Sequence, residues 1–234
     1  MRAVRAGIGR AGIGRARVGA GLAGLVAVGV LAAPMAHAAK AKPACDLVTD
    51  PAGDVIGTAP GVDNGDYDIR SADVATDKRN LTAVIRLTSL APNTAVSTAG
   101  RTYEFDFTAN GHTFGLQAAL LTGGASYQAV VYDTSTPGGR TGTDLGDIVG
   151  VVDTAHHEIR MTAPLWIFAT YASFKQTYIA DLDVTSGRAG GYGAVDPPGG
   201  KVHIGSEAAT VVVDDASSTA RYLPGARSCV AVGK

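Results

Sequence analysis

The side chains of this chain that could do chemistry begin with a group of aspartates. The stretch "DPAGDVIGTAPGVDNGDYDI" carries aspartate at positions 50, 54, 63, 66 and 68, among glycines and prolines. Calcium prefers about six to eight oxygen ligands, and a loop rich in Asp and Gly can turn several carboxylates inward. Ordinary turn formation explains this composition and is the favoured interpretation, since the spacing differs from that of an EF-hand. The alternative is a calcium site formed by Asp50, Asp54 and Asp68, because the Pro-Ala-Gly turn between the first two can bring their carboxylates together.

Other acidic and histidine residues are weaker candidates for catalysis. Asp181 and Asp183 in "IADLDV" would share one face of a strand, as the carboxylate pair of a glycoside hydrolase requires, although an outward-facing polar strand explains them more simply. The run His156, His157, Glu158 lacks the second histidine of the H-E-x-x-H zinc motif and fits a solvated turn. The sequence therefore identifies no catalytic residue and favours a non-catalytic protein.

The amino-terminal region has the pattern of an export signal. Five arginines precede an uncharged run from Val18 to Ala33, and the small residues of "AHA" at 36–38 suit a signal peptidase. We predict a signal peptide over residues 1–38 and a single secreted, extracellular domain over 39–234. An uncleaved amino-terminal anchor is the alternative.

The charge of the predicted mature chain limits its partners. Residues 39–234 carry 15 basic and 21 acidic side chains, a net charge of −6. An acidic protein without a basic stripe repels nucleic acid. No later segment is apolar and long enough to span a bilayer, so we expect no membrane span after signal cleavage.

The two cysteines, Cys45 and Cys229, lie near the two ends of the predicted mature chain. In an oxidising compartment we expect them to form a disulfide. A reactive thiol is the alternative, but neither cysteine has a CxxC partner or a histidine nearby in the sequence.

A two-residue hydrophobic period dominates the chain after the aspartate-rich stretch. Residues 81–87 and 102–107 alternate apolar and polar side chains, as half-buried strands do. Asn110-Gly111 predicts a tight turn within a hairpin over 101–121. About nine to eleven short strands with little helix, apart from one or two turns within 165–177, predict an all-β fold. We expect a single antiparallel, jelly-roll-like β-sandwich, with a barrel as the alternative.

The order of these motifs resembles a known group of domains. "DPAGD", "DIRSADVATDKRNLTAVIRL", "YEFDF", "TFGLQAAL" and "EIRMTAPL" follow one another as in secreted bacterial β-sandwiches related to family 9 carbohydrate-binding modules and DOMON-like domains. The resemblance covers most of residues 50–165 and implies a β-sandwich that binds a sugar, haem or another ligand. Sugar-binding members stack their ligand on exposed aromatic rings, and Trp166 is the single tryptophan of this chain. No Met or His pair matches the haem ligands by position.

These observations lead to one functional expectation and two alternatives. We expect a secreted, non-catalytic β-sandwich that binds a ligand or partner such as a saccharide or a cell-envelope component. A hydrolase using a carboxylate pair is the first alternative. A structural or inhibitory envelope protein is the second.

Overall fold

The computed structural model describes residues 43–55, 64–92, 100–121, 124–133, 135, 141–175, 177–190 and 209–231. The chain divides into two units, Met1–Ala39 and Lys40–Lys234, and the described residues all belong to the second. The predicted signal peptide and Asp63 therefore lie outside the described residues.

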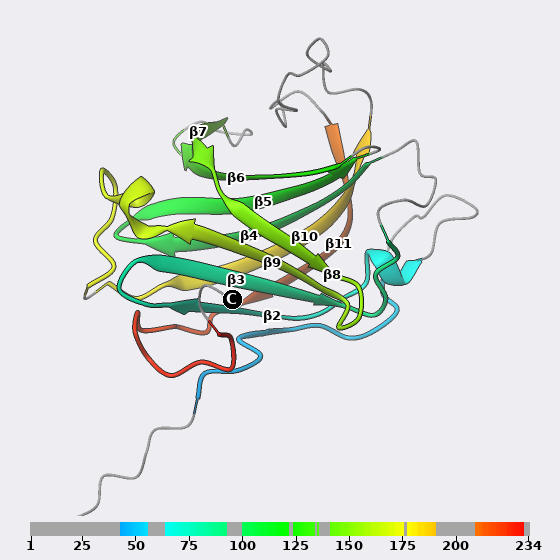
Figure 1. Cartoon of the computed structure of the whole chain (residues 1–234), viewed down its shortest axis with the longest axis horizontal. Helices are drawn as coiled ribbons and strands as arrows, with labels where there is room; N and C mark the ends of the chain where they lie inside the picture. Colours follow the sequence, from blue (N-terminus) through cyan, green and yellow to red (C-terminus); the bar gives the residue numbers. More distant parts are fainter. Residues whose placement is uncertain are drawn as a thin grey trace, which may run out of the picture. The chain divides into compact units, whose positions relative to one another are not determined.

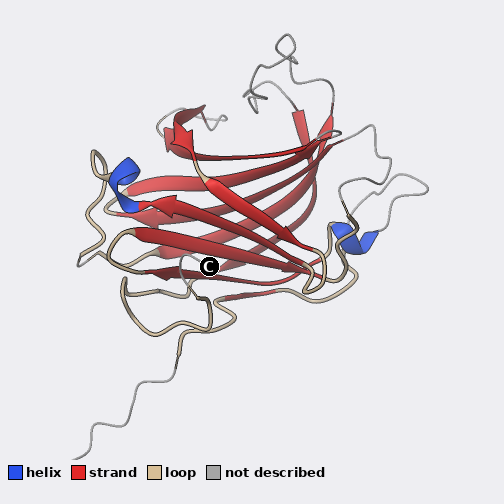
Figure 2. Ribbon diagram, in the orientation of Figure 1, coloured by secondary structure: helices blue, strands red, loops and turns tan. Residues whose placement is uncertain are grey.

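The strands form two antiparallel sheets that pack as two layers (Figures 1 and 2). In spatial order, the five-stranded sheet contains β1 (Val48–Thr49), β2 (Ile69–Thr76), β3 (Asn80–Leu87), β9 (Glu158–Pro164) and β8 (Val149–Asp153). The six-stranded sheet contains β11 (Ala209–Ser218), β10 (Ala180–Gly190), β4 (Gly100–Ala109), β5 (His112–Leu121), β6 (Gly124–Asp133) and β7 (Thr141–Asp147). Two short 3₁₀ helices, η1 (Asn64–Asp66) and η2 (Leu165–Phe168), complete the regular structure of the described ranges. The predicted all-β sandwich is confirmed.

The predicted hairpin is formed by β4 and β5. Ala109 pairs with His112 at its tip, and Phe105 pairs with Leu116 further along the two strands. Asn110 and Gly111 adopt positive φ angles of 54° and 78°, the left-handed conformation that a two-residue turn between antiparallel strands needs. The structure therefore confirms the tight Asn110-Gly111 turn that the sequence predicts.

Alternating residues of the strands fill the space between the sheets. Phe107 and Phe114 stack with ring centroids 5.4 Å apart, and Phe114 meets Phe168 of η2 edge to face at 5.3 Å. Phe174, in the segment after η2, packs on Phe168 at 5.5 Å. These aromatic contacts fix η2 and the following segment to the core.

The two terminal segments cover part of the outer face of the five-stranded sheet, over β2 and β3. Cys45 and Cys229 are joined in a disulfide with Cα atoms 5.3 Å apart, as predicted. Just beyond the bond, Val230 packs on Ala75 and Val84, whose side chains point away from the central core. Val84 is fully buried for this reason, although its alternation within 81–87 predicts a side chain on the polar face.

The same outer face carries an ion-pair network. The Arg86 guanidinium lies 2.7 Å from the buried Asp73 carboxylate and 2.9 Å from Glu158, and Arg160 also contacts Glu158, at 3.3 Å. Asp73 accepts a further hydrogen bond at 3.0 Å from the backbone N–H of Leu47, next to β1. The buried Asp73 carboxylate is thus neutralised by arginine and joined to the amino-terminal segment.

We expect loss of the disulfide to loosen both terminal segments. A Cys45→Ser, Cys229→Ser variant should lose about 2–4 kcal/mol of unfolding free energy, because the bond constrains a long loop in the unfolded chain. Denaturant unfolding of the variant and of the oxidised and reduced wild type measures this loss. An equal midpoint for all three would contradict a stabilising role for the bond.

Candidate functional site

The predicted pair of aspartates lies on a tight turn that follows β1. Gly53, with a φ of 86°, allows the Pro-Ala-Gly segment to reverse between Asp50 and Asp54. The backbone N–H of Gly53 donates to both carboxylate oxygens of Asp68, each at 3.1 Å. Asp68 also accepts a hydrogen bond from the Thr88 hydroxyl at 2.7 Å. Asp68 therefore holds the turn that presents the other two aspartates.

The third carboxylate of the cluster is that of Asp214 in β11. A register shift between Ser186 and Gly187 of β10 accompanies a bulge in β11 near Asp214. One oxygen of Asp214 accepts the N–H of Ile69 at 2.7 Å and the other accepts the N–H of Asp215 at 3.0 Å. Asp214 thus connects the edge strand of one sheet to β2 of the other.

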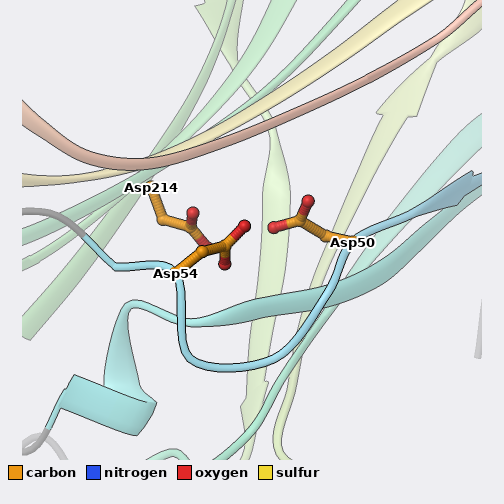
Figure 3. Close-up of side chains that lie close together, drawn as sticks. All are labelled: Asp50, Asp54 and Asp214. Carbon is orange, nitrogen blue, oxygen red and sulfur yellow. The ribbon is translucent and has the colours of Figure 1, made fainter.

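The carboxylates of Asp50, Asp54 and Asp214 converge (Figure 3). One oxygen from each lies within 4.8 Å of the others. Calcium–oxygen bonds are about 2.3–2.6 Å long, so two oxygens on one ion lie at most about 5 Å apart. The arrangement therefore fits three ligands of a single divalent cation, and water or backbone carbonyls would have to complete the coordination.

The electrostatics of the cluster oppose ionisation of Asp50 and Asp214. Burial, followed by the charges of Asp214, Asp54, Asp68 and Asp215, raises the pKa of Asp50 to about 6. Burial also raises the pKa of Asp214, although its backbone N–H donors act in the opposite direction. Asp50 Oδ2 is buried and has no hydrogen-bond partner among the described residues. A divalent cation would offset this repulsion.

The other acidic residues of the predicted loop have structural partners. Asp66 forms a buried ion pair with Arg101 at 2.5 Å, and it accepts the N–H of Ala91 at 2.7 Å. Asp68 lies beside the cluster but is not one of the three converging carboxylates. Of the three predicted ligands, Asp50 and Asp54 therefore lie together in the structure. The third carboxylate of the cluster is that of Asp214, in place of Asp68.

Sequence reasoning missed Asp214 because this residue lies far along the chain from the aspartate-rich stretch. The segment "ATVVVDDASS" reads as a strand with two ordinary polar residues near its end. The signal that could have found it is the two-residue period of a strand. This period places Asp214 on the same face as Ala216, and that face is buried. A buried carboxylate on a strand needs partners.

A second candidate site is a pocket beside Trp166. The indole is 74% exposed, so it is a surface residue, not part of the core. The pocket has a volume of about 930 Å³ and lies among three segments. These are the β2–β3 turn at Thr76–Lys78, the region of η2 and the residues after it, and the carboxy-terminal turn at Pro224 and Gly225.

Hydrogen bonds between these segments hold the walls of the Trp166 pocket in place. The Gly225 N–H donates to the Thr76 hydroxyl at 2.7 Å, and the Thr76 N–H donates to the Tyr222 hydroxyl at 3.1 Å. The N–H of Leu165 donates to the carbonyl of Arg79 at 2.7 Å. The pocket is therefore preformed, which lowers the entropy that the protein loses when a ligand binds.

Asp181 and Asp183 line a different pocket, of about 790 Å³, which Asp106 and Asp215 also line. Asp181 has a φ of 48° at a register shift in β10, and its carboxylate accepts the Thr108 hydroxyl at 2.7 Å. The two predicted carboxylates therefore border one hollow on the outer face of the six-stranded sheet.

The two histidines of the "HHE" run lie in the turn between β8 and β9, and Glu158 is the first residue of β9. His156 is exposed and contacts Asp153 at 2.7 Å, which raises the pKa of its imidazole through the hydrogen bond. Glu158 belongs to the ion-pair network of Arg86.

No described helix is long and apolar enough to cross a membrane.

Comparison of the chain with protein-family models, with curated proteins and with solved structures returned no match. The resemblance to family 9 carbohydrate-binding modules and DOMON-like domains therefore stays a prediction. Inference about function depends on the geometry of the sites themselves.

Calcium binding stays a prediction that melting experiments can decide. If calcium occupies the cluster, a hundredfold excess over Kd should stabilise the fold by about 2.7 kcal/mol. Asp54→Asn should weaken this response, because it removes one charged carboxylate of the cluster. Asp54 is exposed, so the substitution should disturb the fold little. Asp46→Asn, an exposed aspartate outside the cluster, is the matched control. Equal melting temperatures in calcium and in chelator would contradict calcium binding, and the aspartates would then serve only to form the turn.

The raised pKa of Asp50 predicts a pH dependence without metal. A carboxyl whose folded pKa is about 6 binds its proton more tightly in the folded chain, so its contribution to stability falls as pH rises from about 4 to 6. Asp50→Asn should remove this fall and raise the unfolding free energy at pH 7 by about 1 kcal/mol, because solvent screens part of the effect. Chelator-treated unfolding curves from pH 4 to 8 measure it. Parallel curves for wild type and variant would contradict the assignment.

Proposed function

We propose that this protein is an exported, non-catalytic β-sandwich that binds a saccharide in the Trp166 pocket. The observation that carries the proposal is a largely exposed indole at the rim of a preformed pocket. A pocket of about 300–1,000 Å³ is typical of small-ligand sites. Export agrees with the predicted signal peptide and with the Cys45–Cys229 bond, since disulfides persist in oxidising compartments.

Exposed apolar groups gather at the same end of the sandwich. Besides Trp166, the exposed large hydrophobic residues include Tyr178 and Leu223, which flank the β-bridge between Ile179 and Tyr222. Leu223 adjoins Pro224 of the pocket wall. An indole presents a flat apolar face and one N–H donor, which suits the C–H face and hydroxyl edge of a sugar ring. Stacking would remove apolar surface from water on both partners.

A carboxylate-pair hydrolase is the second candidate function. Its support is the placement of Asp181 and Asp183 along one pocket with two further aspartates. Polysaccharide cleavage that depends on Asp183 would favour this candidate over binding alone. A structural envelope protein, the remaining alternative, has no specific observation in its favour among the described residues.

The saccharide proposal predicts that Trp166→Ala weakens saccharide binding without unfolding the protein. We expect the variant to lose at least about tenfold in affinity for saccharides that the wild type selects from an oligosaccharide panel. Its melting temperature should change little, because the side chain is mostly exposed. Val149→Ala, at an exposed apolar residue on β8, is the control. A folded wild type that binds no saccharide, or a variant of equal affinity, would refute the proposal.

A further inference from the structure

The walls of the Trp166 pocket carry a charge that differs from that of the rest of the protein. Lys78 and Lys175 both line the pocket, one from the β2–β3 turn and the other from the segment after η2. They are the two lysines within the described residues, whereas the predicted mature chain has a net charge of −6. Both lysines of the described chain therefore border one pocket of an acidic protein.

Neither ammonium is neutralised by a carboxylate of the described residues. Lys78 and Lys175 are exposed, and neither forms an ion pair within the part of the chain that the structure describes. Asp77 also lines the pocket, but one of its carboxylate oxygens accepts the N–H groups of Arg79 and Asn80 at 2.6 and 2.7 Å. These bonds lower the pKa of Asp77 and direct the carboxylate to the turn backbone. The lysines keep their donors for a ligand.

The pocket walls fix the backbone that carries the two lysines. The Asp77 carboxylate closes the turn that carries Lys78, and the ring of Phe174, the residue before Lys175, is buried against Phe168. Trp166 lies on η2, whose neighbours Ile167 and Phe168 are buried. An apolar ring and two ammonium groups therefore surround one cavity, and an ammonium binds carboxylate or phosphate oxygens strongly.

We propose that the Trp166 pocket selects an anionic saccharide, one that bears a carboxylate or phosphate, through Lys78 and Lys175. This inference rests on the proposed function, because it assigns a ligand class to the same site. The sugar ring stacks on Trp166, and its acidic group accepts hydrogen bonds from the lysines.

The test compares matched saccharides by calorimetry at two salt concentrations. The probes are an oligohexuronate, the same oligomer with its carboxyl groups reduced to alcohols, and a phosphate-bearing sugar polymer of similar length. We expect the wild type to bind an acidic probe at least about tenfold more tightly than the neutral one, with a preference that weakens as salt rises. The better of the two acidic probes identifies the source of the charge.

The variants separate the two proposals. Lys78→Gln, Lys175→Gln should lose the acidic preference and keep the affinity for the neutral oligomer, whereas Trp166→Ala should weaken all probes. Arg70→Gln, an exposed cation at the other end of β2, is the charge control and should change nothing. A preference that persists in the lysine variant, or equal wild-type affinity for neutral and acidic oligomers, overturns the anionic inference and leaves saccharide binding intact. An acidic peptide of similar length and charge is the non-saccharide control. If Trp166→Ala binds the sugars as tightly as the wild type, or if the acidic peptide binds the wild type as tightly as the sugars, the proposed function is wrong.

Discussion

The covalent link between Cys45 and Cys229 tethers one segment of each candidate site to the other. Asp50 and Asp54 follow Cys45 by a few residues, through the short strand β1 that pairs with β2. Pro224 and Gly225 precede Cys229 by a few residues and form one wall of the Trp166 pocket. The aspartate turn and the pocket wall are therefore anchored through the same bond, together with the backbone bridge between Ala44 and Ser228.

The two sites lie at opposite ends of β2. Ile69, the first residue of the strand, donates its N–H to Asp214 of the aspartate cluster, and Thr76, the last, lines the Trp166 pocket. At about 3.3 Å per residue, the strand separates the two sites by roughly 20–25 Å. The aspartate cluster lies at one end of the strand and the two lysines lie at the other, where Asp77 also lines the pocket.

Features encoded by neighbouring residues were predictable from the sequence. The alternation in 81–87 and 102–107 places apolar side chains in the core, and Asn110-Gly111 supplies the positive φ angles of its hairpin. The reversal between Asp50 and Asp54 is local as well, because Gly53 permits it. Each of these features depends on the geometry of a few consecutive residues.

Features that join distant segments were not predictable. Val84 has the pattern of a solvent-facing residue, but Val230 covers it from the far end of the chain. Asp214 joins the cluster because of a bulge in β11 and the proximity of two sheet edges, neither of which leaves a periodic signal. The Trp166 pocket needs three segments, so the sequence could single out the tryptophan but not its exposure or its two lysines.

The separation of 184 residues between the cysteines also imposes an order of events on the maturing chain. Ribosomes make Cys45 long before Cys229, so its thiol waits unpaired while nearly the whole sandwich is synthesised. During that interval Val230 does not yet cover Ala75 and Val84, so these two apolar side chains are exposed and can promote aggregation of the nascent chain. In the folded chain, oxidation therefore ties the two terminal segments together and holds Val230 over Ala75 and Val84.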